Sequence, residues 1–107
     1  MSRTSWLNRR MAAQRSWTRP EQLLALELYL SLPFGRLNKG TPEVVAVANA
    51  IKRTPSSVAM KACNLASLDE SFRKTGRKGL GRVSAADRAL WNEFIEHRDR
   101  IVEEMEA

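Results

Sequence analysis

Hydrophobic residues recur at helical spacing in four stretches of the chain, and a start signal precedes each stretch. A hydroxyl residue stands first, and a proline or an acid follows within three positions. The hydroxyl accepts a hydrogen bond from a free amide of the first turn, where proline has no amide to satisfy. The four hydroxyl residues are Thr18, Thr41, Thr54 and Ser84. The pattern predicts an all-α, four-helix domain.

The first and last predicted helices differ in how their apolar residues are distributed. In residues 23–30 apolar side chains surround almost the whole circumference, interrupted by Glu27, which is typical of a central helix. From Ser84 onward a single apolar stripe runs between charged residues, so we expect one long amphipathic C-terminal helix. The end of that stripe either completes the core or contacts a second subunit or a partner protein. Its residues are Ile101, Val102 and Met105.

The two middle helices are separated by about three residues, which is the helix-turn-helix arrangement. In the helix that begins after Thr54, small apolar residues share one face. The other face has no acid, although a solvated face normally carries Glu as well as Lys. Its residues are Ser56, Ser57, Met60, Lys61 and Asn64. We interpret this face as one that contacts a ligand.

The charge distribution indicates which ligand. Residues 1–20 carry five arginines and no acid, and residues 52–82 carry eight cations against two acids. Residues 83–107 have a formal charge of −4, although the chain as a whole has +6. Such asymmetry is expected of a protein that binds a polyanion on one side. Residues 1–16 are a basic flexible arm, either a disordered tail or a contact to phosphates and the minor groove, and residues 17–107 form one domain.

A second basic segment, residues 72–82, combines five cations with three glycines. Glycine lets a backbone approach a ligand closely and exposes its amides. The segment is therefore either a flexible connector or, as we favour, a loop that contacts phosphates. It lacks the spacing of a Walker loop.

These features together predict a protein that binds double-stranded DNA, with the helix after Thr54 in the major groove. Side chains on its outer face would reach base edges or nearby phosphates, with Lys61 and Asn64 as the best candidates for base readout. The cations would contact phosphates independently of sequence. The side chains of the outer face are Ser56, Ser57, Met60, Lys61 and Asn64. The cations expected to contact phosphates are Arg53, Arg73, Lys74, Arg77, Lys78 and Arg82.

Several segments, in this order, resemble the N-terminal domain of a group of bacterial HNH-type restriction endonucleases. They are Trp17-Thr18 with the Leu-rich helix, LPFG at 32–35, RTPSSVAMK at 53–61, NLASLD at 64–69, GRKGL at 76–80 and DRALWNEF at 87–94. The resemblance covers about residues 16–106. It implies a helical DNA-binding module ahead of a metal-dependent nuclease. The first three helices also have a looser similarity to Myb/SANT-like domains.

The chain departs from that family because it ends at Ala107, where the nuclease domain would follow. HNH chemistry needs a histidine to activate water and further metal ligands, and His97 is the single histidine. We therefore expect no enzymatic activity, metal or cofactor. The single cysteine, Cys63, is expected in the core. Without a secretory signal or a membrane-length apolar run, the expected location is the cytoplasm, near the nucleoid.

Three functions remain open at this stage. The first is DNA binding, as a transcriptional regulator, a phage or mobile-element recognition protein, or the specificity part of a nuclease on another chain. The second is a protein–protein adaptor that acts through the C-terminal helix. RNA binding is weaker, because the aromatic residues stand where a core needs them and not on a basic face. They are Trp17, Trp91 and Phe94.

Overall fold

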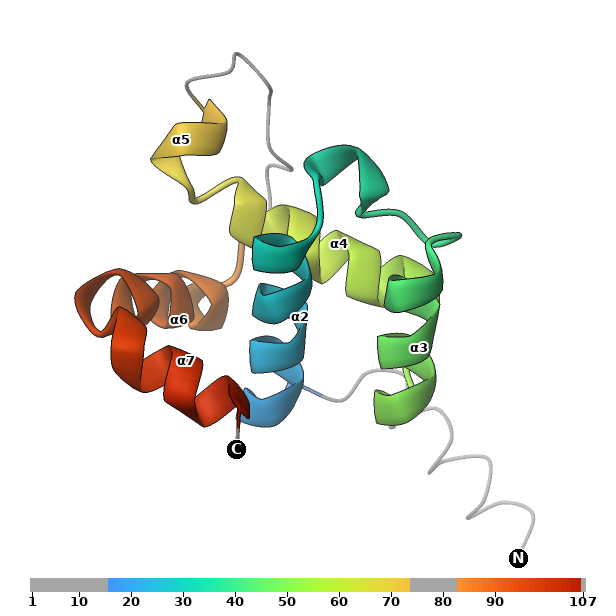
Figure 1. Ribbon diagram of the computed structural model, residues 1–107, viewed down its shortest axis with the longest axis horizontal. Helices are drawn as coiled ribbons and strands as arrows, with labels where there is room; N and C mark the ends of the chain where they lie inside the picture. The colour runs from blue at the N-terminus through green and yellow to red at the C-terminus, as the bar shows by residue number, and fades with distance from the viewer. Residues whose placement is uncertain (1–15, 74–82, 107) are drawn as a thin grey trace, which may run out of the picture.

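The computed structural model describes residues 16–73 and 83–106, and all regular secondary structure in these ranges is helical (Figure 1). The elements are α2 (Arg19–Ser31), the 3-10 helix η1 (Phe34–Arg36), α3 (Pro42–Ile51), α4 (Pro55–Ala66), α5 (Glu70–Arg73), α6 (Ala85–Glu96) and α7 (Arg98–Glu106). The all-α prediction is confirmed for this part of the chain. None of the described helices is long and apolar enough to span a membrane. Most of the predicted arm, residues 1–15, and the basic segment 74–82 lie outside the described residues.

Three of the four predicted helix starts have the side-chain cap that the sequence indicates. At α2 the cap is reciprocal, because Thr18 N–H also donates to Glu21 Oε1 at 2.9 Å. The Thr18 hydroxyl accepts a hydrogen bond from Glu21 N–H, the Thr54 hydroxyl from Ser57 N–H, and the Ser84 hydroxyl from Asp87 N–H. These bonds satisfy amides that have no partner within the helix.

The fourth start, Thr41, follows a different arrangement. Thr41 precedes Pro42 as predicted, but its side chain makes no capping bond to α3. Its hydroxyl donates instead to Asn38 Oδ1 at 3.2 Å, and the same oxygen accepts from Gly40 N–H at 3.0 Å. Asn38 thus organises the loop between η1 and α3. Leu37, only 5% exposed, anchors that loop in the core.

Helix α4 is the central element, in contact with α2, α3 and α6. Its inner face is made of small residues, and Ala62 and Ala66 are completely buried. Small side chains allow neighbouring helix axes to approach closely. Leu65 of α4 packs in the cluster that contains Phe94 of α6, whereas Val58 packs in the cluster that contains Val44 of α3. Helix α4 therefore contributes to both clusters of the core.

The predicted long C-terminal helix is in fact two helices, α6 and α7, which meet at an angle (Figure 1). His97 separates them with φ −135° and ψ 51°, outside the helical region. The break loses little hydrogen bonding, because His97 N–H donates to Glu93 O at 2.8 Å and Ile101 N–H donates to His97 O at 3.0 Å. Asp99 stands in the first turn of α7, where the helix dipole favours an acid.

Of the two alternatives left open for the last apolar residues, the bend favours completion of the core over a partner surface. Ile101 is 0% exposed and belongs to the same core cluster as Leu26 and Phe94. Val102 and Met105 are partly buried and pack against that cluster. A straight helix would have carried Ile101 away from the core, and the bend returns it to α2. The second half of the stripe thus completes the core.

Replacing Ile101 by alanine tests this assignment. Removing a fully buried isoleucine leaves a cavity, so Ile101→Ala should lower the free energy of unfolding by about 2–5 kcal/mol. The matched control is Ile95→Ala, because Ile95 lies on α6 and is 56% exposed. The control should change stability by less than about 0.5 kcal/mol. Urea unfolding followed by circular dichroism measures both; equal, small effects would mean that Ile101 is not a core residue.

Candidate nucleic-acid interface

Three residues, Lys52, Arg53 and Thr54, connect α3 to α4. Lys52 adopts the left-handed conformation, with φ 58° and ψ 45°, and its N–H donates to Ala48 O. A left-handed residue of this kind commonly ends a helix. Thr54 then caps α4 within two residues. The chain therefore changes direction over a very short turn.

Arg53, predicted to contact phosphates, points into the protein. Its side chain is 7% exposed, and Nη2 donates to Glu21 Oε1 at 3.1 Å and to Ser16 O at 3.0 Å. The guanidinium lies 4.3 Å from the centroid of the Trp17 ring, within the range of a cation–π contact. These contacts tie the α3–α4 turn to the start of α2. The structure thus engages Arg53 inside the fold, and its position does not support the expected phosphate contact.

Lys61, predicted to read bases, is also engaged within the protein. Its Nζ lies 3.0 and 3.2 Å from the two carboxylate oxygens of Asp87, and 5.1 Å from the Trp17 centroid. The side chains of Lys61 and Asp87 are 12% and 1% exposed. This ion pair connects α4 to α6. Lys61 does not lie on the exposed side of α4, so the expected role in base readout is not supported by its position.

The exposed side of α4 carries no charge. Ser56 is exposed, Met60 is 57% exposed, and Ser57 and Asn64 are half-buried. Ser67, which the sequence reasoning missed, continues the line as a half-buried residue at the end of the helix. Residues 56, 60, 64 and 67 are spaced by four, four and three, which places them on one stripe of a helix. We call these four residues the α4 stripe.

The side-chain amide of Asn64, on the α4 stripe, is half-buried. Its Oδ1 is enclosed and has no hydrogen-bond partner among the described residues. Ser67, by contrast, donates its hydroxyl to Asn64 O at 2.6 Å. A buried acceptor without a partner costs about 1–3 kcal/mol.

The positive charge of the chain is concentrated outside the described residues. The described ranges contain ten Lys and Arg against twelve Asp and Glu, which gives a formal charge of −2. Residues 1–15 and 74–82 contain eight cations and no acid. The predicted phosphate contacts Lys74, Arg77, Lys78 and Arg82 fall there, and the side chain of Arg73 is likewise outside what the structure describes.

The cysteine and the histidine differ in exposure: one is half-buried and the other is exposed. Cys63 is half-buried, with Sγ 3.7 Å from Leu37 O, and burial raises the pKa of its thiol, which disfavours the nucleophilic thiolate. His97 is exposed, with Nε2 4.0 Å from Glu96 Oε2. Within residues 16–73 and 83–106 no group of three or more acidic, histidine or cysteine side chains could hold a metal ion.

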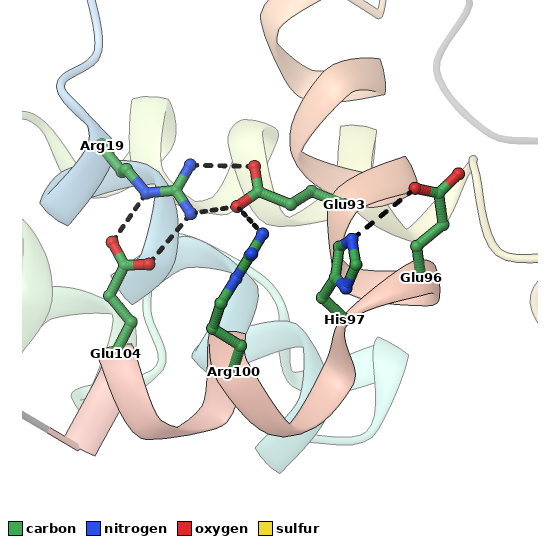
Figure 2. Close-up of polar contacts among 6 residues, drawn as sticks. All are labelled: Arg19, Glu93, Glu96, His97, Arg100 and Glu104. Atoms are coloured by element: carbon green, nitrogen blue, oxygen red, sulfur yellow. Dashed lines mark hydrogen bonds and ion pairs between the residues drawn. The ribbon is translucent and has the colours of Figure 1, made fainter.

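A second polar cluster connects α2 to both C-terminal helices (Figure 2). Arg19 binds two carboxylates at once: Nε and Nη2 donate to Glu104 at 2.6 and 2.9 Å, and Nη1 and Nη2 donate to Glu93 at 3.1 and 2.5 Å. Arg100 adds a contact of 3.4 Å to Glu93. The hydrogen bonds from Arg19 lower the pKa of both carboxyl groups and raise the pKa of the guanidinium. Arg19 is therefore part of the fold and not of the basic arm.

The lowered pKa values of Glu93 and Glu104 make the Arg19 contribution depend on pH. It is present above the ordinary carboxyl pKa of 4.5 and is lost as pH falls through the lowered values in the folded protein. Arg19→Met should therefore unfold at lower urea concentration than the wild type at pH 7, and the two should converge toward pH 2. Arg88→Met is the control, because the described residues show no ion pair at exposed Arg88. If Arg19→Met still unfolded at a lower urea concentration than the wild type at pH 2, that result would contradict the ion-pair explanation.

Breaking the Lys61–Asp87 pair tests its place in the fold. Lys61→Met leaves a buried carboxylate without its partner and should lower the free energy of unfolding by about 3–5 kcal/mol. The double variant Lys61→Met with Asp87→Leu removes both charges and should return to within about 1 kcal/mol of the wild type. Urea unfolding at pH 7 gives both values. If Lys61→Met alone left the free energy of unfolding unchanged, the ion pair would not stabilise the fold, and Lys61 would be available to bind a ligand.

Comparisons of the chain with models of protein families, with curated proteins and with solved structures found no match.

Proposed function

We propose that the chain is a non-catalytic module that binds double-stranded DNA, in which α3 and α4 act as a helix-turn-helix and α4 enters the major groove. The observation that carries the proposal is the α4 stripe, an uncharged and partly exposed side of α4, together with the turn of three residues that separates α3 from α4. An α-helix fits the major groove, where side chains can reach base edges.

The placement of charge supports the same function. The acids of the chain all lie in the described part, whereas residues 1–15 and 74–82 are purely basic. In the sequence, the basic segment 74–82 begins eight residues after α4 ends at Ala66. These cations, together with Arg73, are the candidates for phosphate contacts, in place of the internally bound Arg53 and Lys61. The resemblance of residues 16–106 to the N-terminal domains of HNH-type nucleases agrees with this proposal.

The adaptor alternative has less support. It relied on an exposed apolar stripe at the C-terminus, and Ile101, the centre of that stripe, is completely buried. The exposed apolar residues of the described part are Leu30, Met60 and Ile95, on three different helices. No specific observation therefore favours a partner protein over DNA.

DNA binding is tested by fluorescence anisotropy with a random-sequence duplex across a salt series. We expect affinity to fall steeply with salt, because bound cations release counterions from the phosphates. Arg77→Glu with Lys78→Glu should weaken binding at least about tenfold near 0.1 M salt and reduce the log–log slope by about two. Circular dichroism should show an unchanged fold.

The matched control is Arg98→Glu with Arg100→Glu on α7, which changes the net charge equally but lies on the acidic C-terminal segment. We expect this variant to retain near wild-type affinity. Equal weakening by both pairs would mean that binding follows net charge alone and has no defined face. Absence of binding to any duplex at low salt would refute the proposed function.

A further inference from the structure

Helix α2 is apolar around almost its whole circumference, yet the described residues cover only part of it. It is in contact with α3, α4 and α7, and Figure 1 shows it between α3 and α7. Leu24, near the middle of α2, packs in neither of the two core clusters and is only partly buried. A helix that is apolar on all sides normally lies inside a core. Within residues 16–73 and 83–106, one side of α2 therefore lacks the cover that its sequence indicates.

Two adjoining hollows lie along this side of α2. One is between α2 and α7 and the other between α2 and α3, with volumes of about 380 and 470 Å³. Leu24 and Glu27 line both hollows, so we treat them as one feature, the α2 groove. Each volume is within the range of about 300–1,000 Å³ that is typical of binding clefts. The groove is lined by the apolar residues Leu24, Val47 and Met105 and by the acids Glu27, Glu43 and Glu104.

The charge of this lining limits what can occupy the α2 groove. It contains three glutamates and no cation, which disfavours a nucleic acid. Glu43 and Glu104 pair with arginines of the fold, whereas Glu27 makes no ion pair within the part of the chain that the structure describes. A two-fold dimer through this groove would bring the glutamates of two copies together, which is also unfavourable. The expected occupant is apolar and basic.

The first fifteen residues of the chain have this composition. Residues 1–15 carry four arginines and no acid, and the apolar residues Trp6, Leu7 and Met11 stand among the arginines. The segment joins the described part at Ser16, close to the start of α2. Fifteen extended residues reach about 50 Å, whereas the α2 residues that line the groove extend over about 18 Å. Because the segment is tethered, its effective concentration at the groove is on the order of millimolar, so contacts of modest affinity suffice.

We propose that residues 1–15 of the same chain occupy the α2 groove, with their apolar residues on its floor and their arginines beside its glutamates. In this arrangement Trp6 covers Leu24, and a neighbouring arginine pairs with Glu27. The segment then completes the apolar cover of α2. The inference goes beyond the proposed function and does not depend on it, because the contact lies within one chain.

The docking is tested by nuclear magnetic resonance of the full, ¹⁵N-labelled chain, through the indole N–H signal of Trp6. Trp6→Phe identifies this signal by its disappearance, and a peptide of residues 1–15 gives the position of the signal for an undocked segment. We expect the signal of the wild type to be shifted from that of the peptide. Leu24→Lys and Glu27→Lys should each return it to the position in the peptide, because both place a cation against the arginines of the segment.

The matched controls are Ile95→Lys and Glu103→Lys, which introduce the same charges at exposed positions that do not line the α2 groove. Both should leave the Trp6 signal where it is in the wild type. Equal displacement by the groove variants and by their controls would overturn the proposal, because the signal would then follow net charge. A wild-type signal that coincides with that of the peptide would overturn it as well.

A dilution series separates the same chain from a second copy as the source of the segment. Docking within one chain does not depend on protein concentration, so the Trp6 signal should stay shifted on dilution, with a monomer mass in sedimentation. A shift that disappears on dilution, together with a dimer mass, would place the segment in the groove of another copy and would overturn the assignment to the same chain. These experiments contain no DNA, so their failure would leave the proposed function to its own test.

Discussion

Two buried ion pairs beside one tryptophan ring determine the position of α4. Arg53 pairs with Glu21 of α2, Lys61 pairs with Asp87 of α6, and both cations lie within 5.1 Å of the Trp17 ring centroid. The inner face of α4 combines three alanines with the larger Val58 and Leu65, which pack in the two core clusters. A displaced α4 would lose these contacts and would also leave a buried charge without its partner, which is strongly unfavourable. The ion pairs thus act together with the apolar contacts to hold one orientation of α4.

That orientation decides which side chains of α4 face outward. With Lys61 directed to α6 and Arg53 directed to α2, the exposed side retains hydroxyl, thioether and amide groups. Arg53 and Lys61 are engaged in internal contacts, and under the proposed function the phosphate contacts would come from the cations of residues 1–15 and 74–82. Affinity and base preference would then come from different parts of the chain, since phosphate contacts carry no sequence information and base contacts do.

The C-terminal helices are held by a different kind of interaction. Arg19 forms paired hydrogen bonds to Glu93 and Glu104, but these side chains are between 29% and 41% exposed. Exposed ion pairs contribute little individually because water screens them. The position of α7 therefore depends mainly on the burial of Ile101 against α2, and the arginine aligns helices that apolar packing has already brought together.

Local chemistry along the sequence determined the helix starts at Thr18, Thr54 and Ser84, because a cap and its amide lie within three residues of each other. Thr41 shows the limit of that argument, since Asn38 binds the hydroxyl that the α3 cap would use. The sequence does contain one indication that an acid is buried. Asp87 lies on the same helical line as Leu90, Trp91 and Phe94, so a charge in that position must be buried and requires a partner.

Only the tertiary structure decided what those acids bind. Glu21 is 32 residues from Arg53, and Asp87 is 26 residues from Lys61, so no local pattern relates them. The bend at His97 was hidden for a similar reason. The apolar stripe of residues 84–105 is compatible with one straight helix, and the bend is favoured only because it buries Ile101 against α2. The sequence by itself determined where helices form and where charge collects along the chain. The packing of distant helices decided which charges remain available to a ligand, because burial pairs a cation with whichever acid the fold brings within reach.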